Sequence, residues 1–465
     1  MHPQSRRNQL QDFQFLLVLL PCFLFCQWVS GQDFQPLGGG VTNGNGGHLI
    51  LDTEVDHING VLYVSGIFAE MNNIPCNCIA RWDGVQWDSL GSGAAGCLPG
   101  GPPVRSMVLY KGDLYAAGSF RTGVNFARWN GATWDSIAGF AGTINGFLEH
   151  QDTLWALGSF EQIAGVTSPF IIKYDGQNWH SFVDSHNLEG TNFAAAAFYK
   201  GELYVGGNFW DDDLGIEDLA KWNGQEFERV GTGIQGSLSS VGDMLIFNDR
   251  LYVSGLFSED DGSPGNSVMA WDGSNWDNLQ GGVGEKGNPT VYDLNVLDGK
   301  LYVSGVFQTA GDANANHIAW WDDRQWCGVN DSFGNVITRI EKFQNELVIT
   351  GNFTAISGQP QNRIASRLFS TPPDNCGSPV GLFAFNQQED WFRIFPNPTH
   401  NQFQISTTVG ITEGIPITVY DVYGVVVYQK IWEGEPDFTI SSQSWASGVY
   451  FVHIGTDEPL RLVKN

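Results

Sequence analysis

The sequence predicts an all-β protein: a seven-bladed β-propeller closed by its N-terminal strand, followed by a small β-sandwich. Three observations lead to this fold class. Short apolar runs punctuated by glycine recur along the 465 residues, which include 58 Gly and 17 Trp. Long amphipathic helical patterns are absent. Two motifs repeat together in a constant order, and both the repeats and their residue composition end at about residue 370.

The first repeated motif is an apolar strand of the type "LYVSGIF", with glycine near its end. Successive copies start 40 to 52 residues apart, and periods of about this length are typical of propellers and solenoids. The seven copies occupy residues 62–68, 114–120, 154–160, 203–209, 251–257, 301–307 and 347–353. We expect the glycines to allow close approach of neighbouring sheets.

The second repeated motif is a hairpin such as "IARWDGVQW", in which Asp-Gly or Asn-Gly is expected to form a two-residue turn. Its copies occupy residues 79–87, 126–134, 171–179, 219–227, 268–276 and 318–326. Large aromatic rings recur at the same two places, including Trp82, Trp87, Trp129, Trp134, Trp271 and Trp276. This regularity favours packing between sheets over a set of sugar-stacking platforms.

Each period holds four predicted strands, for example 104–110, 114–120, 126–130 and 132–139. Because strands alternate in direction, the first-to-second and third-to-fourth turns share one face. The longer second-to-third and fourth-to-first connections share the opposite face, which we call the variable face.

The two ends of the repeat region complement each other. The last copy stops after its third strand, and the segment 33–41 matches a fourth strand such as 86–94. The N-terminal segment therefore supplies the missing strand and closes a ring, which removes an open sheet edge. An open solenoid would instead carry caps.

Residues 33–370 resemble kelch-like propellers and the galactose-oxidase-like superfamily. Their "LYVGGxF … WDGxxW" pattern resembles still more the propellers of secreted and cell-surface proteins, including fungal cortical-marker proteins. The resemblance implies the fold and leaves the function open, because propellers host many unrelated activities.

The N-terminus reads as an export signal. Arg6 and Arg7 precede an apolar run over 13–31 that ends in small residues, so we expect cleavage near Gly31. The alternative is a transmembrane anchor, which the shortness of the run and Pro21 disfavour. The predicted domains are a signal peptide at 1–31, a propeller at 32–370, a linker at 371–390 and a C-terminal domain at 391–465.

The C-terminal domain alternates apolar and polar residues, which predicts a small antiparallel sandwich. Its ordered motifs resemble the sorting domain of type IX secretion cargo. The matching residues are Pro396, Asn397, Pro398, Gly424, Gly448, Tyr450 and Lys464. The resemblance implies an outer-membrane secretion machinery as partner and a secreted protein or one on the outer face of the outer membrane. An immunoglobulin-like accessory domain is the alternative.

The net charge of -27 argues against nucleic-acid binding, which needs clustered Lys and Arg. Two acidic loops on the variable face, 210–218 and 258–266, are the candidate binding residues. They contribute Asp211, Asp212, Asp213, Glu259, Asp260 and Asp261. Solvated charge is the preferred interpretation of these loops. Calcium is the one candidate cofactor, and no metal ligand is assigned.

Five cysteines remain once the signal peptide is removed, and an exported chain permits disulfides. Cys97 is expected to pair with Cys76 or Cys78, because all three lie in connections on the variable face. Cys327 and Cys376 are expected to form a bond that fastens the linker to the rim of the propeller.

No sequence motif for catalysis is present, so no catalytic residue is assigned. A copper oxidase of the galactose-oxidase type is disfavoured, because the histidines are scattered and the cysteines lie in loops or beside the linker. We predict a secreted or cell-surface binding module with a glycan or protein ligand at the variable face. The alternatives are a carbohydrate-active enzyme using carboxylates at the mouth of the central channel and a purely structural surface protein.

Overall fold

The computed structural model is all-β and contains many small antiparallel sheets, two short 3₁₀ helices and, among the residues it describes, no α-helix. No helix in this part of the chain is long and apolar enough to cross a membrane. The chain divides into two compact units, Met1–Pro379 and Val380–Asn465. The described residues are 34–42, 48–93, 103–118, 125–182, 188–236, 239–284, 289–329, 331–369, 375–376, 392–395, 399–407, 414–421, 426–432, 437–454 and 460–464.

Consecutive antiparallel sheets of four strands make up the first unit, and the strands of each sheet pair mostly in chain order. Sheet 1 consists of β3 (Leu49–Asp56), β4 (Val61–Ile67), β7 (Ile79–Trp82) and β8 (Trp87–Ser89). Sheet 2 consists of β9 (Val104–Tyr110), β10 (Asp113–Gly118), β11 (Phe126–Trp129) and β12 (Trp134–Ser136). Sheet 3 consists of β13 (Gly142–His150), β14 (Thr153–Phe160), β17 (Ile171–Tyr174) and β18 (Trp179–Ser181). Sheet 4 consists of β19 (Glu189–Tyr199), β20 (Glu202–Asp211), β21 (Ile216–Trp222) and β22 (Phe227–Arg229).

The remaining sheets of this unit follow the same plan. Sheet 5 consists of β23 (Ser240–Phe247), β24 (Arg250–Leu256), β25 (Val268–Trp271) and β26 (Trp276–Asp277). Sheet 6 consists of β27 (Thr290–Leu297), β28 (Lys300–Val306), β31 (Ile318–Trp321), β32 (Trp326–Gly328) and an added β38 (Asn375–Cys376). Sheet 7 consists of β33 (Ile337–Phe343), β34 (Glu346–Gly351), β37 (Ile364–Leu368) and β1 (Gln35–Pro36).

Short extra strands and helices decorate the connections. The extra strands are β2 (Val41–Thr42), β5 (Glu70–Met71), β6 (Ile74–Pro75), β15 (Gln162–Ile163), β16 (Val166–Thr167), β29 (Thr309–Ala310), β30 (Ala313–Asn314), β35 (Ala355–Ile356) and β36 (Gln359–Pro360). The 3₁₀ helices are η1 (Leu37–Gly39) and η2 (Glu259–Asp261).

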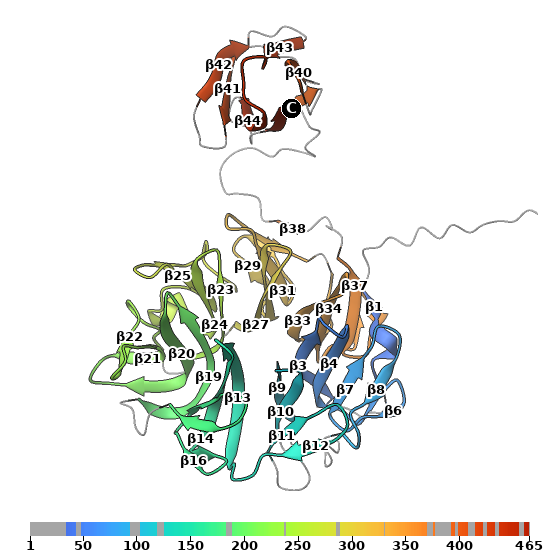
Figure 1. Cartoon of the computed structure of the whole chain (residues 1–465), viewed down its shortest axis with the longest axis vertical. Helices are drawn as coiled ribbons and strands as arrows, with labels where there is room; N and C mark the ends of the chain where they lie inside the picture. Colours follow the sequence, from blue (N-terminus) through green and yellow to red (C-terminus); the bar gives the residue numbers. More distant parts are fainter. Residues whose placement is uncertain are drawn as a thin grey trace, which may run out of the picture. The chain divides into compact units, whose positions relative to one another are not determined.

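A cluster of buried apolar side chains lies between each sheet and the next, including one between sheet 7 and sheet 1. The last of these packs Phe343 and Val348 of sheet 7 with Ile50 and Leu62 of sheet 1. Figure 1 shows the sheets following one another around a common centre. Both faces of every sheet are therefore covered by neighbours.

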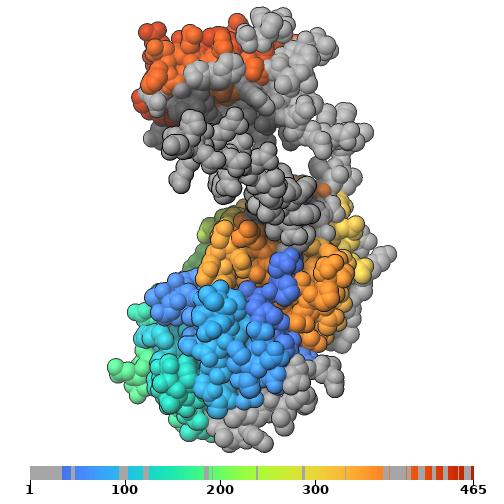
Figure 2. Space-filling model, turned by 90° about the vertical axis from the view of Figure 1, so that its right-hand side faces the viewer, coloured from blue at the N-terminus to red at the C-terminus, as the bar shows by residue number. Residues whose placement is uncertain are grey.

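The N-terminal segment completes the last sheet, as the sequence predicted. Gln35 pairs with Ser366 and Pro36 with Ala365. The side chain of Gln361 adds a hydrogen bond to the carbonyl of Phe34 at 3.1 Å. In Figure 2 the dark-blue N-terminal residues lie against the orange residues of sheet 7.

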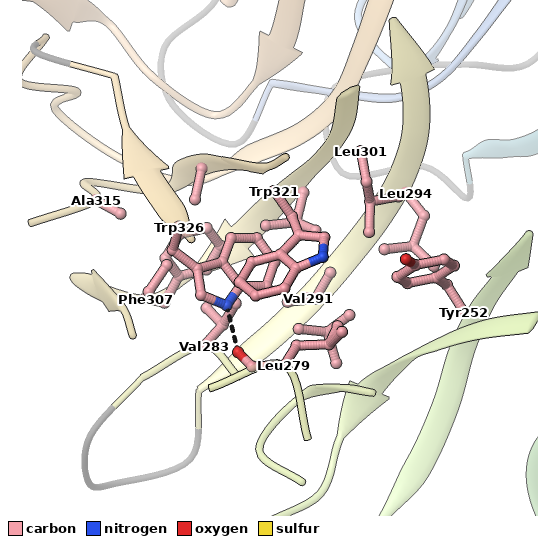
Figure 3. Close-up of a cluster of buried hydrophobic side chains, with 14 of the residues drawn as sticks. Tyr252, Leu279, Val283, Val291, Leu294, Leu301, Phe307, Ala315, Trp321 and Trp326 are labelled. Carbon is pink, nitrogen blue, oxygen red and sulfur yellow. Dashed lines mark hydrogen bonds between the residues drawn. The ribbon is translucent and has the colours of Figure 1, made fainter. Parts of the chain in front are cut away.

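The repeated tryptophans pack between sheets. The rings of Trp321 and Trp326 lie 5.3 Å apart, and both are almost fully buried. Trp326 Nε1–H donates to the carbonyl of Leu279 in the preceding sheet at 2.7 Å (Figure 3). Equivalent bonds join Trp87 to Leu37, Trp134 to Leu90 and Trp276 to Val230. The structure thus supports the packing interpretation.

The hairpins between third and fourth strands differ from the prediction. Trp82 pairs with Trp87, so the loop contains four residues where two were expected. The Asp83 carboxylate accepts the N–H groups of Val85 and Gln86 at 2.8 Å, and Gly84 takes a φ of 95°. Asp at the loop start holds the turn through its side chain, which explains why Asp or Asn recurs there.

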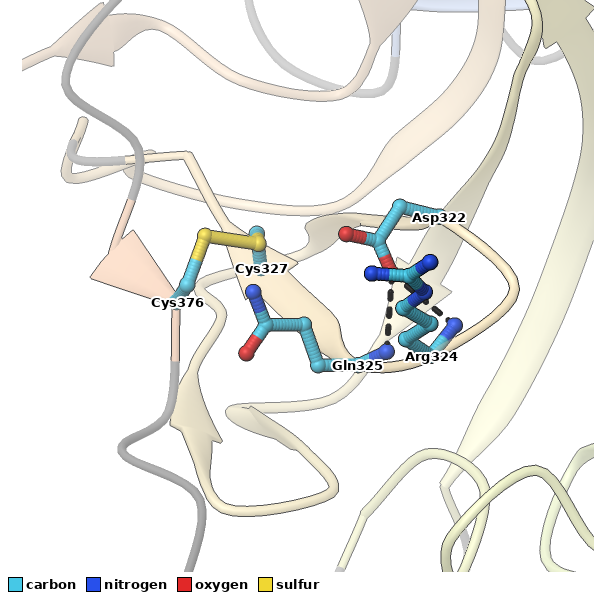
Figure 4. Close-up of a disulfide and its surroundings, with 5 residues drawn as sticks. All are labelled: Asp322, Arg324, Gln325, Cys327 and Cys376. Atoms are coloured by element: carbon cyan, nitrogen blue, oxygen red, sulfur yellow. Dashed lines mark hydrogen bonds between the residues drawn. A yellow bond between two sulfur atoms is a disulfide. The ribbon is translucent and has the colours of Figure 1, made fainter. Parts of the chain in front are cut away.

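Cys327 and Cys376 form a disulfide across the pairing of β32 with β38 (Figure 4). This bond attaches the segment after sheet 7 to sheet 6. Cys78 is also disulfide-bonded, whereas Cys76 is a buried free thiol. Cys97, a predicted disulfide partner, lies outside the described residues.

The second unit is an immunoglobulin-like sandwich of two antiparallel sheets. One contains β39 (Phe392–Phe395), β40 (Gln402–Thr407) and β43 (Asp437–Ser441). The other contains β42 (Val426–Trp432), β41 (Ile415–Asp421), β44 (Gly448–Ile454) and β45 (Leu460–Lys464). Side chains from both sheets, such as Phe403, Phe438, Val419 and Val452, form one buried core.

We predict that Trp326→Ala lowers the free energy of unfolding by about 3–5 kcal/mol, because it opens a cavity between sheets 5 and 6 and removes a buried hydrogen bond. Trp210→Ala is the control and should cost about 1 kcal/mol or less, since that side chain is 40% exposed. Urea denaturation of both variants checks this. Equal costs would contradict the packing role.

Candidate functional site

A β-bulge interrupts the first strand of every sheet at the same place. In sheet 1, Gly66 pairs with Ile50 and Ser65 with Asp52, so Leu51 has no partner. The same shift occurs in the other six sheets. A Cβ atom on Gly66 would lie only 2.1 Å from the carbonyl oxygen of Leu49 in the same sheet. The glycine opposite each bulge therefore accommodates the bulged strand of its own sheet, where close approach between neighbouring sheets was expected. The expected approach does occur at Gly206, where a Cβ atom would lie 2.3 Å from the Val241 side chain of sheet 5.

The bulged residues converge on one cavity of about 610 Å³, which we call the mouth. They are Leu51, Arg105, Asn145, Ala194, Gly242, Tyr292 and Thr338. First strands begin and second strands end at the mouth, so it opens on the variable face. Every residue that precedes a bulged residue is apolar and buried, for example Ile50 and Val291. The repeat thus keeps the scaffold constant and varies the side chain that the bulge directs into the mouth.

A second ring of residues lies one position after the bulges, which we call the inner ring. Its members are Asp52, Ser106, Gly146, Ala195, Asp243, Asp293 and Arg339, and all line a cavity of about 270 Å³. This cavity adjoins the mouth, because Asn145, Ala194, Gly242 and Arg339 line both. The charged members come from sheets 5, 6, 7 and 1, and the small ones from sheets 2, 3 and 4.

The charged members of the inner ring bind one another and the backbone. Asp52 accepts the N–H of Met107 at 2.7 Å, and Asp293 accepts that of Ile340 at 2.8 Å. Asp243 accepts the N–H of Leu294 at 2.8 Å. Each of these N–H groups belongs to the first strand of the next sheet, whose inner edge has no strand beside it. The carboxylates satisfy N–H groups that would otherwise lack a partner.

Arg339 lies within this set of carboxylates. Its Nε is 3.0 Å from Asp52 Oδ1 and 3.7 Å from Asp293 Oδ1, and it also donates to backbone carbonyls. Burial raises the pKa of Asp52, Asp243 and Asp293, although Arg339 acts in the opposite direction. The inner ring is therefore a buried layer in which Arg339 pairs with Asp52 and Asp293, and the aspartates bond to backbone N–H groups.

Two glutamates lie one step deeper on the same strands, Glu54 and Glu341. Burial raises the pKa of Glu54 to about 8 and that of Glu341 to about 7. Glu54 accepts the N–H of Leu109 at 3.0 Å, so it too joins sheets 1 and 2.

The carboxylates of the inner ring hold sheets together and do not form an arrangement typical of a hydrolase. Glycoside hydrolysis needs an acid and a carboxylate placed on either side of the bond to be cleaved. Each aspartate here is instead bound to a backbone N–H. No Asp or Glu lines the mouth among the described residues.

The predicted acidic loops are only partly brought together. Asp211, Asp212 and Asp261 line a separate cavity of about 660 Å³, which also contains the half-exposed Trp210. Asp218, which the sequence analysis did not select, is buried there and accepts the hydroxyl of Ser239 at 2.5 Å. Burial raises the pKa of Asp218 to about 7.

The other predicted acidic residues do not line that cavity. Asp213 is exposed, and Asp260 is an exposed residue of η2. Glu259 accepts the side-chain amide of Asn278 at 2.8 Å. Within the described residues, no group of three or more His, Cys, Asp or Glu side chains is placed to hold a metal ion.

Three of the predicted sorting residues belong to the described part of the second unit. Tyr450 is buried and its hydroxyl donates to the carbonyl of Ala446 at 2.8 Å. Gly448 pairs with Lys464 across β44 and β45. The others lie outside the described residues: Pro396, Asn397, Pro398 and Gly424.

Sequence reasoning missed both rings, although two signals mark them. The recurring glycine of the first motif marks the bulge opposite it. The residue before that glycine is Ser or Thr in the four sheets whose inner-ring member is charged: Ser65, Ser254, Ser304 and Thr350. In the other sheets it is Ala117, Leu157 or Gly206.

Comparison with known proteins assigns the second unit. Residues 393–464 match the family described as "Secretion system C-terminal sorting domain". The chain is therefore an export substrate of the type IX secretion route, and it is secreted or attached to the cell surface. Its tail interacts with the type IX secretion machinery. No curated protein matches the chain.

Two solved structures are similar only in a distant way. A fungal alcohol oxidase of the AA5 family, in complex with copper, shares 11% identity at a TM-score of 0.34, covering 94% of this chain and all of the other. Dimeric latent PorU from Porphyromonas gingivalis shares 11% identity at a TM-score of 0.14, covering 76% of this chain and 31% of the other. Scores this low carry no argument about fold or function.

We predict that the free energy of unfolding falls as pH rises from about 4.5 to about 8, because folded Glu54 keeps its proton over this interval and the unfolded chain releases it. Glu54→Gln keeps an acceptor for Leu109 and should flatten this slope. Glu226→Gln, on an exposed loop, is the control for loss of one charge. Urea denaturation across pH 4 to 9 checks this, and identical slopes for wild type and Glu54→Gln would contradict the assignment.

Proposed function

We propose that residues 32–370 form a closed seven-bladed propeller, which acts as a secreted or cell-surface glycan-binding module through the mouth. The 1–31 segment is removed as a signal peptide, 371–390 is a linker, and 391–465 directs the protein to the outer face of the outer membrane. The observation that carries the binding function is the convergence of all seven bulged residues on one cavity.

Three contacts support ring closure. β1 pairs with β37, an apolar cluster joins sheets 7 and 1, and Thr338 Oγ1 donates to the carbonyl of Ile50 at 2.7 Å. Four-stranded units with this repeat length are the plan of propellers. Because closure brings every first strand to the centre, seven variable side chains meet where an open array would spread them apart.

The character of the mouth favours a glycan over a protein. Its volume suits a ligand of a few sugar rings, whereas a stable protein interface buries roughly 800 Å² on each partner. The lining offers amides from Asn145, Asn192, Asn208 and Asn352, which can both donate to and accept from hydroxyl groups. Tyr292, 41% exposed, provides an aromatic ring for the apolar face of a sugar.

The carbohydrate-active enzyme is the weaker alternative. It requires reactive carboxylates facing the ligand, and the described carboxylates nearest the mouth are bound to backbone N–H groups. Release of reducing sugar from a bound oligosaccharide would favour the enzyme over the binding module.

We predict that removing residues 393–464 leaves the protein in the periplasm, because the sorting domain is then missing from the exported chain. Cell fractionation with immunodetection checks this. Ile431→Ser, at an exposed position of the same unit, is the control and should be exported normally. Normal export of the truncated chain would contradict the role of the tail.

We predict that the purified full chain binds a defined subset of a glycan array, and that Tyr292→Ala weakens this binding about tenfold through loss of an aromatic contact. Trp210→Ala, in the acidic-loop cavity, is the matched control and should bind as wild type does. The array is read with and without calcium. Two results would instead assign the binding site to the acidic loops. The first is that Trp210→Ala loses binding while Tyr292→Ala keeps it, and the second is that wild type binds only when calcium is present.

A further inference from the structure

The mouth differs in charge from the rest of the molecule. The chain carries a net charge of -27, with 50 acidic and 23 basic Lys and Arg residues. The charged side chains among the described residues that line the mouth are nevertheless Arg105 and Arg339, both basic. The carboxylates near the centre lie instead in the inner ring below the mouth, and others line the acidic-loop cavity.

The two arginines are in different states. Arg339 is bound to Asp52 and Asp293, so its charge is largely compensated within the protein. Arg105 is an exposed bulged residue, and it makes no hydrogen bond or ion pair with any other described residue. A bulge that directs an unpaired guanidinium into a cavity leaves that charge available to a ligand.

We propose that the mouth recognises acidic sugars, with Arg105 binding the carboxylate of a uronic-acid residue; this inference rests on the glycan-binding function proposed above. The planar guanidinium of arginine matches a carboxylate through two parallel N–H···O bonds. The sugar ring that carries the carboxylate also carries hydroxyl groups, which meet the amides of the mouth.

Two of these amides are free to bind. The side chains of Asn192 and Asn352 make no hydrogen bond with other described residues. Asn145 donates to the carbonyl of Phe193 at 3.3 Å, which orients it and leaves its oxygen as an acceptor. A peptide ending in a free carboxylate would engage Arg105 equally well, but it lacks the several hydroxyls that would use these amides.

The carboxylates below the mouth do not cancel this preference. Asp52, Asp243 and Asp293 each accept a backbone N–H of the next sheet. Asp52 and Asp293 also pair with Arg339, so their charge is engaged within the protein. Each lies one residue deeper than the bulged residue of its own strand, whereas Arg105 is itself a bulged residue. A ligand carboxylate therefore meets the guanidinium before it meets the inner ring.

Calorimetric titration of the purified full chain tests the proposal with three probes. These are a trisaccharide of galacturonic acid, the neutral galactose trisaccharide of the same linkage, and a tripeptide with a free C-terminal carboxylate. Arg105→Gln is compared with Arg105→Lys. Arg81→Gln, on the third strand of sheet 1, is the control for loss of an arginine charge outside the mouth, although Arg81 is half-buried and pairs with Asp88. Each titration is run at low and high sodium chloride.

We expect wild type to bind the acidic trisaccharide at least tenfold more tightly than the neutral one, with the preference weakened by salt. Arg105→Gln should remove the preference, Arg105→Lys should keep part of it, and Arg81→Gln should change nothing. Equal binding of both sugars by wild type would overturn the acidic-sugar inference and leave glycan binding intact. Binding of the tripeptide alone, or of no probe, would overturn the inference and count against the glycan function as well.

Discussion

The pairing of Gln35 and Pro36 with Ser366 and Ala365 joins the beginning of the repeat region to its end. A sheet of four short strands exposes two apolar faces, and neither can be buried within the sheet itself. Every face must therefore meet a neighbour, and the first and last sheets can do so only against each other. The apolar cluster between sheets 7 and 1 meets this need, and the short N-terminal strand supplies the last sheet with its fourth member.

The same arrangement leaves the inner edge of each first strand without a neighbouring strand. The inner ring satisfies part of that edge with carboxylates, and the bulge just before it directs one side chain of each sheet into the mouth. The residue that lines the mouth and the residue that joins the sheets are thus neighbours along the strand. The apolar residue before the bulge packs, and the bulged residue lines the mouth. In sheets 1, 5, 6 and 7 the next residue bonds to the adjoining sheet.

Much of the fold follows from particular residues. The glycine motif and the aromatic hairpin located the second, third and fourth strands, and the matching ends identified 33–41 as the missing strand. The loop of the hairpin was predicted too short, because the Asp83 side chain closes a four-residue turn that resembles an Asp-Gly two-residue turn in sequence. The acidic loops were selected as candidate binding residues because they are runs of charge. Asp211, Asp212 and Asp261 share a cavity, however, only because sheets 4 and 5 pack together.

The sequence by itself determined the strand content, the repeat, the role of the tryptophans and the export tail, because each is written in residues close together in the chain. Only the tertiary structure decided which side chains meet at the centre. Arg105 and Tyr292 are 187 positions apart and gain a common cavity through the bulges of two different sheets. Side-chain direction at a bulge depends on strand register, and register is set by the pairing of backbones, which residue identity reports only indirectly through the glycine on the facing strand.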